Sequence, residues 1–199
     1  MTTLFGRILA ILGAMTLIGF AGSAAAQVST TTALDNATTQ TNRVMRLGSP
    51  STCSAAQAVP SLYLFAVDLA YDSYTLTNTS GSTQCYDIFL TQTASDLFVV
   101  AYSGSFSPAD PSLNYLGDAG SSTQDSSFSV NVPNGQTLVV VVHEVGRGTG
   151  VGQTYTVTAS AHVAPPAPVP TMSEWAMILL ATILAGGTAL YLQRRRLTA

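Results

Sequence analysis

Two continuous apolar segments at opposite ends of the chain confine its folded part to the region between them. The first, residues 8–20, has 13 residues without a charge, and the second, residues 175–192, has 18. Between them the chain is rich in Ser, Thr, Gly and Tyr. A chain of 199 residues has room for one domain besides such terminal segments. We therefore expect a single folded domain between two membrane-directed ends.

The N-terminal segment, residues 1–26, has the pattern of a cleavable signal peptide. Arg7 supplies a positive charge, and the apolar run that follows is too short to span a bilayer comfortably. Ala24-Ala25-Ala26 then fits the small-residue rule for cleavage sites. We predict that signal peptidase cuts between Ala26 and Gln27. The alternative is an uncleaved membrane anchor.

The C-terminal apolar segment, residues 175–192, predicts a transmembrane helix. A helix of this length measures about 27 Å, close to the hydrocarbon core of roughly 30 Å. Trp175 and Tyr191 lie near its two ends, as aromatic residues do at membrane interfaces, and Arg194, Arg195 and Arg196 follow at once. The positive-inside rule places these arginines in the cytoplasm, so the body of the protein faces outward.

The segment that precedes this helix is Val169-Pro170-Thr171-Met172-Ser173-Glu174-Trp175-Ala176. With the helix and the arginines it resembles the IPTL-CTERM class of bacterial sorting signals, in which a motif of the form I-P-T-L-x-x-W-G precedes a membrane helix and a basic end. Pro170, Thr171 and Trp175 match the motif directly. Val169 and Met172 replace Ile and Leu conservatively, and Ala176 replaces Gly.

This resemblance implies that a membrane-embedded exosortase-type transpeptidase recognises the tail, residues 172–199, and cuts near the motif. The residues of the motif would then be substrate rather than catalyst, and the body would be released or passed to an envelope acceptor. Pro170 favours an extended cleavage site outside the helix. The alternative is a permanent single-pass anchor, which would leave the tail intact on protein from the native envelope.

Two segments that flank the central region lack a clear strand pattern. Residues 27–44 are rich in Thr, and we expect them to be flexible or to form at most one edge strand. Residues 164–171 contain four of the nine prolines of the chain, which favours a short, stiff polyproline II stalk between the domain and the tail.

Residues 45–163 predict an all-β domain, because their apolar residues recur with a period of two. Phe128, Val130 and Val132 alternate with polar residues, whereas 138–142 is apolar throughout, as in a central strand that is buried on both sides. Seven such segments lie between turn signals: 61–67, 71–77, 86–91, 97–102, 127–132, 138–142 and 154–161. We predict a single β-sandwich or jelly-roll-like domain of about seven strands, flanked by a signal-peptide helix and a transmembrane helix.

Cys53 and Cys85 are the two cysteines of the sequence. In an exported chain an even pair predicts a disulfide. Closing its loop of about 32 residues would stabilise the fold by roughly 3–4 kcal/mol in the chain-entropy model. A pair of reactive thiols is the alternative, although the cysteines lack CxxC spacing.

Several blocks of the body, 71–75, 104–106, 114–118 and 132–136 with 139–142, together resemble a β-sandwich module of bacterial surface proteins. The resemblance is broadly to modules of the pre-peptidase C-terminal type. It implies an accessory or adhesive role, with an envelope polymer or a surface protein as the partner.

The body is acidic. Between residues 27 and 163, nine Asp and Glu residues stand against three Arg, which gives a net charge of about −6. A surface of this sign repels phosphate backbones, so we expect no nucleic-acid partner.

Candidate catalytic groups are few. His143, which precedes Glu144, and His162 are the histidines of the sequence, and no G-x-S-x-G nucleophile elbow occurs. We therefore expect no catalytic residues and no cofactor, and we predict a non-enzymatic structural, adhesive or binding role. The alternative is an uncharacterised secreted hydrolase, which should lose turnover when His143 is replaced.

Two loops invite a ligand-binding interpretation. Asp110, Asn114 and Asp118 are candidate calcium ligands within 105–122, but calcium requires six or more oxygens, so we expect no metal. The Gly-rich segment 146–152 is similar in composition to a phosphate loop, but the flanking segments predict strands and no helix follows. We expect it to be a mobile hairpin loop.

Overall fold

The structure is a computed structural model that describes residues 27–163 and 172–197, with only the backbone described for residues 65–67 and 172–173. The chain divides into two compact units, one ending at His162 and one beginning at Val163. They are the β-domain and the C-terminal unit, and each is described by itself. The predicted signal peptide, including Ala26, and the predicted Pro-rich stalk, residues 164–171, lie outside the described residues.

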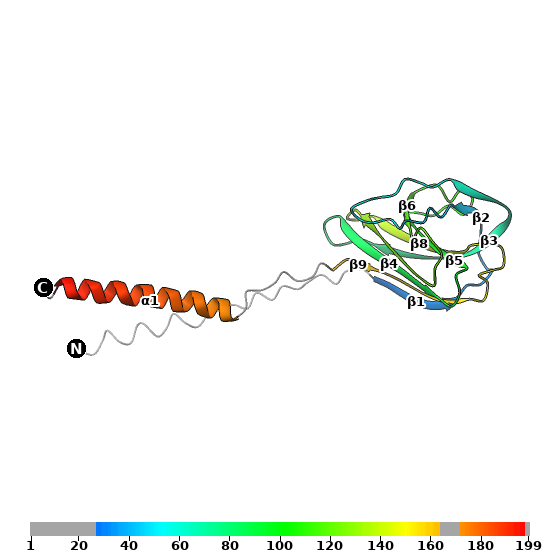
Figure 1. The fold of residues 1–199 in the computed structure, drawn as a ribbon. Coiled ribbons are helices and arrows are strands. Elements are labelled where there is room, and N and C mark those ends of the chain that lie inside the picture. Colours follow the sequence, from blue (N-terminus) through cyan, green and yellow to red (C-terminus); the bar gives the residue numbers. More distant parts are fainter. Residues whose placement is uncertain (1–26, 164–171, 198–199) are drawn as a thin grey trace, which may run out of the picture. The chain divides into compact units, whose positions relative to one another are not determined.

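The β-domain contains nine strands among its described residues. They are β1 (Gln27–Ala33), β2 (Thr39–Val44), β3 (Leu62–Thr77), β4 (Gln84–Gln92), β5 (Leu97–Ser103), β6 (Tyr115–Asp118), β7 (Asp125–Val132), β8 (Thr137–Glu144) and β9 (Thr154–Ala161). A four-stranded sheet has the order β1-β9-β4-β7, and a five-stranded sheet has the order β2-β3-β8-β5-β6. Figure 1 shows how the strands are arranged within the domain. The predicted all-β, two-sheet architecture is confirmed.

The four-stranded sheet has one buried face and one open face. Tyr86, Ile88 and Leu90 of β4 are buried, whereas Phe89 between them is half exposed. β7 and β9 show the same alternation, as period-two side-chain placement requires. The inner face meets the other sheet through a polar contact within the core. The Tyr155 hydroxyl of β9 donates to Asp72 Oδ2 at 2.5 Å and pairs with the Tyr74 hydroxyl at 2.7 Å.

The five-stranded sheet is buried on both faces at its centre. All six residues from Leu97 to Tyr102 in β5 are at most 1% exposed, and β8 lies between β3 and β5. This central position confirms the prediction made for 138–142. Phe106 covers part of the outer face, with its ring centroid 5.1 Å from that of Tyr71 and 4.7 Å from that of Tyr102.

Residues 27–44 form two strands, so the prediction of a flexible segment or one edge strand was wrong. β1 pairs along its whole length with β9, and β2 pairs with the first half of β3. Thr has high β-propensity, and the hydroxyls of Thr31 and Thr156 hydrogen-bond across the strands at 2.8 Å. An edge strand of Thr and Ser has little apolar contrast, so its period of two is hard to detect. Within the described residues, the first strand of the domain therefore begins at residue 27 rather than after 45.

β1 and β2 account for nine strands in place of about seven, and two further differences cancel in the count. The segments 61–67 and 71–77, predicted as separate strands, form the single 16-residue strand β3. β3 pairs with β2 up to Ala70 and with β8 from Tyr71 onward. β6 lies in the segment that was predicted to be an oxygen-rich loop.

The segment around Ser51 bridges the two sheets at the edge strands β6 and β7. The Ser51 amide donates to the Asp118 carbonyl at 2.9 Å, and the Ser129 amide donates to the Ser51 carbonyl at 3.0 Å. The Asp118 amide donates to Ser51 Oγ, also at 3.0 Å. Gly117 allows this close approach, because a Cβ there would lie 2.6 Å from Ser51 Oγ. One short segment thus ties together the open edges of both sheets.

The C-terminal unit contains the helix α1 (Met172–Leu197). The segment Glu174–Leu197 is long and apolar enough to cross a membrane, and none of its most apolar window is buried. The helix extends beyond both ends of the predicted span, 175–192. Glu174 lies in its first turn and the three arginines in its last, where each charge is stabilised by the helix dipole.

Candidate functional site

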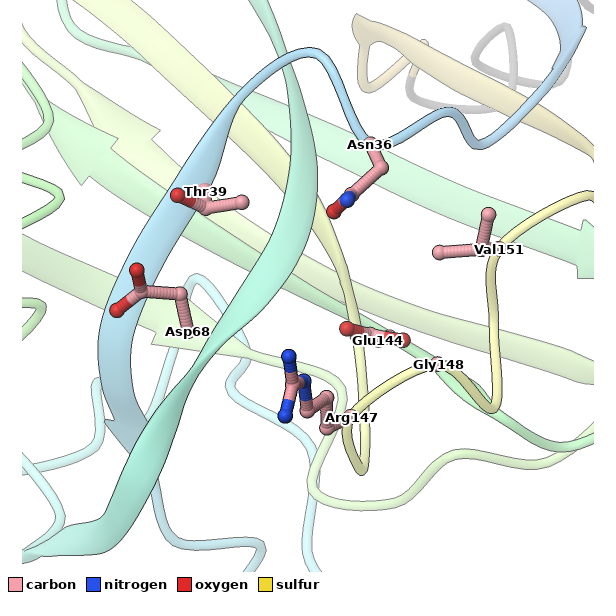
Figure 2. A pocket seen from close by; sticks show the side chains of 7 residues that line it. All are labelled: Asn36, Thr39, Asp68, Glu144, Arg147, Gly148 and Val151. Atoms are coloured by element: carbon pink, nitrogen blue, oxygen red, sulfur yellow. The ribbon is translucent and has the colours of Figure 1, made fainter.

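A pocket of about 720 Å³ lies at one end of the five-stranded sheet of the described β-domain. Four segments contribute its lining: the β1–β2 connection, β2, β3, and the end of β8 with the loop that follows. Figure 2 shows the side chains of the seven lining residues. They are Asn36, Thr39, Asp68, Glu144, Arg147, Gly148 and Val151.

Glu144 is the most enclosed polar group of this pocket, at 1% exposure. Its Oε1 accepts a hydrogen bond from the Ala70 amide at 2.9 Å, and its Oε2 accepts one from the Gly150 amide at 3.4 Å. A Cβ on Gly150 would lie 2.9 Å from the Glu144 Cβ and 2.5 Å from Leu97 Cδ2. The carboxylate therefore joins β3 and the following loop to the end of β8, and glycine is needed for the contact.

The Gly-rich loop, 145–153, positions Arg147, Gly148 and Val151 at the pocket. It connects β8 to β9, which lie in different sheets, so the prediction of a hairpin was wrong. The Gly152 amide donates to the Leu34 carbonyl at 2.8 Å, and the Val145 amide donates to the Asp96 carbonyl at 2.7 Å. The loop is held at both ends by these bonds.

His143 and Glu144, the neighbours that a hydrolase would use, lie on opposite faces of β8, because side chains alternate along a strand. His143 is 1% exposed and packs edge-on against Phe98, with ring centroids 5.6 Å apart. Its Nδ1 is 2.8 Å from the Glu144 carbonyl oxygen, and its Nε2 is buried. Burial lowers the pKa of His143 to about 4, so the ring is neutral at pH 7.

The calcium candidates take part in separate hydrogen-bond groups. Asp110 accepts from the Ser112 hydroxyl and amide, which lowers its pKa. The Asn114 side-chain nitrogen Nδ2 donates to the Ser105 carbonyl.

Asp118 is buried in β6, and its carboxylate accepts from the Tyr115 hydroxyl and the Gly120 amide, both at 2.6 Å. Burial raises its pKa. Its carboxylate serves the fold around β6, and the interactions of these three residues do not assemble a common set of ligands.

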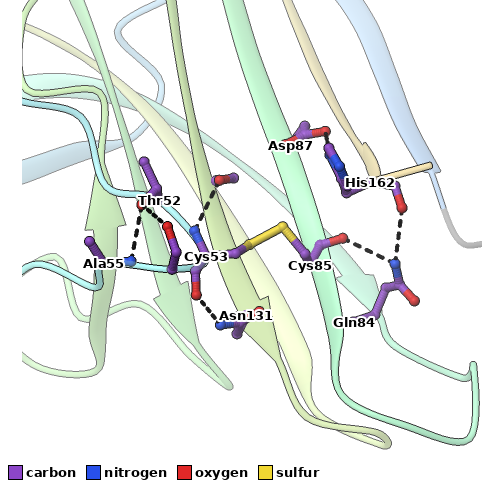
Figure 3. The surroundings of a disulfide bond; sticks show 10 residues. Thr52, Cys53, Ala55, Gln84, Cys85, Asp87, Asn131 and His162 are labelled. Carbon is purple, nitrogen blue, oxygen red and sulfur yellow. Dashed lines mark hydrogen bonds and ion pairs between the residues drawn. A yellow bond between two sulfur atoms is a disulfide. The ribbon is translucent and has the colours of Figure 1, made fainter. Parts of the chain in front are cut away.

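Cys53 and Cys85 form the predicted disulfide, with their Cα atoms 5.9 Å apart (Figure 3). The Asn131 side chain donates to the Cys53 carbonyl at 2.7 Å, and the Cys53 amide donates to Ser129 Oγ at 3.1 Å. These contacts hold the segment around Ser51 against β7.

Beside the disulfide, Nδ1 of His162 lies 2.7 Å from Oδ2 of Asp87 (Figure 3). With Cys85, these residues form the one group of three or more metal-ligating side chains found in the described part of the chain. The sulfur of Cys85 is committed to the disulfide, so it is not a thiolate ligand. The group is a histidine–aspartate contact beside a covalent bridge.

The sorting motif begins, within the described residues, at Met172, because Val169, Pro170 and Thr171 precede them. Met172 and Trp175 lie in the first turn of α1, and the basic cluster lies in the last. The large apolar side chains between them are exposed around the helix, as a lipid-facing helix requires. Residues 167–196 match the IPTL-CTERM motif. The tail is an IPTL-CTERM signal. The prediction made from Pro170, Thr171 and Trp175 is thereby confirmed.

The IPTL-CTERM signal marks the chain as an exported protein that a sorting machinery handles, with α1 as its membrane-anchoring helix. A comparison with curated proteins finds no match. The resemblance of the body to pre-peptidase C-terminal modules therefore stays a prediction.

Of the pocket residues, the sequence singled out Glu144 and the Gly-rich segment. Sequence analysis missed Asn36, Thr39 and Asp68, because these residues do not belong to a common sequence motif. Thr39 and Asp68 become neighbours through the pairing of β2 with β3. A prediction of β2 as a strand paired with β3 would have brought Thr39 and Asp68 together.

Proposed function

We propose that the protein is an exported, non-enzymatic binding module of the bacterial envelope, with the β-domain on the outer side of the membrane. Signal peptidase removes residues 1–26, and an exosortase-type transpeptidase then cuts near Pro170 and Thr171. The observation that carries the binding role is the polar pocket at the end of the five-stranded sheet. Its ligand is a polar segment of an envelope polymer or of a neighbouring surface protein.

The chemistry of the lining supports a ligand with both donors and acceptors. Asn36 and Thr39 offer an amide and a hydroxyl, and Asp68 and Arg147 offer charges of opposite sign. Two carboxylates line the pocket with one guanidinium, so a polyanion is disfavoured by the local charge. Hydroxyl and amide groups, as on a sugar polymer or a peptide backbone, match this mixture.

The environment of the residues that hydrolysis would need favours binding over catalysis. His143 is enclosed, and a general base must come within hydrogen-bond reach of the proton that it removes. Both oxygens of Glu144 already accept backbone hydrogen bonds. Neither residue is disposed to activate a nucleophile, so the secreted hydrolase is the weaker hypothesis.

A pull-down with the full-length protein in nanodiscs tests the pocket. The probes are the polysaccharide and the protein fractions of the native envelope, each immobilised separately. Arg147→Ala should weaken retention on one fraction about tenfold, as the loss of one hydrogen-bonded charge predicts. Asp125→Asn, a charge change on the other sheet, should leave retention unchanged.

Two results would contradict the proposal. Retention on neither fraction would remove the binding role. Turnover of an envelope substrate that disappears with Glu144→Gln would favour the hydrolase instead.

A further inference from the structure

The register of β2 with the first half of β3 is interrupted by a bulge. Thr41 pairs with Asp68 and Arg43 pairs with Tyr63, so Asn42 alone lies opposite residues 64–67. Asn42 has a left-handed φ of 64°, at the point where the register shifts. The four unmatched residues of β3 are Leu64, Phe65, Ala66 and Val67, all of them apolar.

This bulge adjoins an exposed apolar surface. Leu64 is 74% exposed, the highest value among the large apolar side chains described for strands and loops up to His162. Its chain neighbour Tyr63 lines a hollow of about 300 Å³, together with Arg43, Met45, Arg46 and Leu47. Leu47 is 60% exposed, Tyr63 45% and Met45 39%. We call these six residues, Leu64 included, the basic-apolar patch. Clustered apolar exposure of this kind marks an interaction surface.

The two arginines of the patch are held in place by the fold. The Arg43 guanidinium lies 4.9 Å from the centroid of the Tyr63 ring, and its Nε donates to the Val145 carbonyl at 3.1 Å. Arg46 is exposed, and its guanidinium donates to the Ser122 hydroxyl. Two of the three arginines between residues 27 and 163 thus lie here, in a region whose net charge is about −6. Arg43 is only 6% exposed, so Arg46 is the exposed positive charge of the patch, on a domain of net negative charge.

We propose that the basic-apolar patch docks the β-domain onto an anionic phospholipid surface. The exposed side chains of Leu47 and Leu64 enter the headgroup region. Tyr63 lies at the interface, and Arg46 approaches the lipid phosphates. Basic residues beside exposed apolar and aromatic side chains are the combination that interfacial membrane binding uses. The charge selects this occupant, because the rest of the domain repels an anionic bilayer and so sets the face that approaches it.

The segment that connects the β-domain to α1 makes such docking intramolecular. Ten residues separate Ala161 from Met172, and a chain of that length spans at most about 35 Å whatever its conformation. Linked sites of this kind have a high effective concentration, so a weak surface contact is sufficient. After the sorting signal is cut, the patch would be the remaining membrane contact of the domain.

Spin labels on the full-length protein in nanodiscs test the proposal. The label is attached at Leu64→Cys and, as a matched control, at Leu113→Cys, which replaces a leucine of 51% exposure outside the patch. The disulfide keeps Cys53 and Cys85 unreactive. Collisions with oxygen, which concentrates in lipid, are compared with collisions with a water-soluble nickel chelate.

In nanodiscs of phosphatidylcholine with about one quarter phosphatidylglycerol, the label at 64 should be protected from the chelate and the label at 113 should not. Adding Arg46→Gln should lower the docked population about fivefold, the effect of one arginine near an anionic surface. Arg147→Gln, which removes the same charge at the pocket, should leave it unchanged. This pair separates the patch from the proposed pocket.

Equal chelate access at both labels would overturn the proposal. Equal protection in pure phosphatidylcholine would also overturn it, because the contact would then be independent of lipid charge. Protection that rises with protein concentration in lipid-free detergent would also overturn it, because the patch would then bind a second copy of the chain instead of the membrane.

Discussion

The two sheets of the β-domain differ in how many of their faces are buried. The four-stranded sheet packs one face on the core and leaves the other open, with Phe89 half exposed among Ser and Thr. The five-stranded sheet is covered on both faces at its centre, and it carries the pocket and the basic-apolar patch at its margin. In this fold the more enclosed sheet carries both candidate binding surfaces.

The sharpest test of this difference replaces one phenylalanine in each sheet. Phe98→Ala in β5 should cost about 3–5 kcal/mol of unfolding free energy, since it leaves a cavity in a fully buried strand. Phe89→Ala on the open face of β4 should cost less than about 0.5 kcal/mol. Urea unfolding followed by tyrosine fluorescence measures both. Equal losses would remove the distinction between the sheets.

The next effect concerns the segment that bridges the sheets. Replacing Cys53 and Cys85 together by serine should lower the unfolding free energy by roughly 3–4 kcal/mol, because the open chain regains the entropy that the loop had lost. The same denaturant titration, with the wild type under oxidising conditions, provides the value. A double variant as stable as the wild type would show that hydrogen bonds at Ser51 alone close the edges.

The buried histidine of the five-stranded sheet gives a pH test. Burial depresses the pKa of His143 in the folded state to about 4, from an ordinary value near 6.5. The unfolded chain therefore binds a proton first as the pH falls. The contribution of His143 to the free energy of unfolding is fully present above about pH 6.5. It declines by up to about 3 kcal/mol as the pH falls toward 4.

The control for this test is His143→Gln, which should remove that slope. Asp118 shifts stability in the opposite direction over the acid range, because burial raises its pKa. Comparing the variant with the wild type at each pH isolates the histidine. Parallel pH profiles of the two proteins would contradict the account.

A smaller effect is expected at the pocket. Gly150→Ala should cost about 1–3 kcal/mol, because the added Cβ would press on Leu97 and Glu144. Gly146→Ala in the same loop is the matched control, since the nearest atom there is 3.6 Å from the added Cβ. Thermal unfolding of both variants distinguishes them. A pair of equally stable variants would mean that the loop yields without strain.

The contrast between local and distant pairing explains what the sequence could predict. The tail was recognisable because motif, helix and arginines follow one another along the chain. The disulfide could be predicted because the sequence contains two cysteines, and β8 could be predicted from its unbroken apolar run. The two strands in 27–44 were not predicted, because Thr-rich edge strands lack an alternation of apolar and polar residues. The pocket escaped because Asp68 reaches Thr39 only through strand pairing, and pairing registers are not encoded locally.

The central claim is that an exported binding domain passes through a membrane-anchored stage and is then cut at its sorting signal. Intact mass spectrometry of the protein purified from its native envelope tests it most directly. The account predicts a polypeptide that begins at Gln27 and ends near Pro170 or Thr171, with or without an attached acceptor. A mass that retains both Met1 and the IPTL-CTERM tail through Ala199 would contradict it.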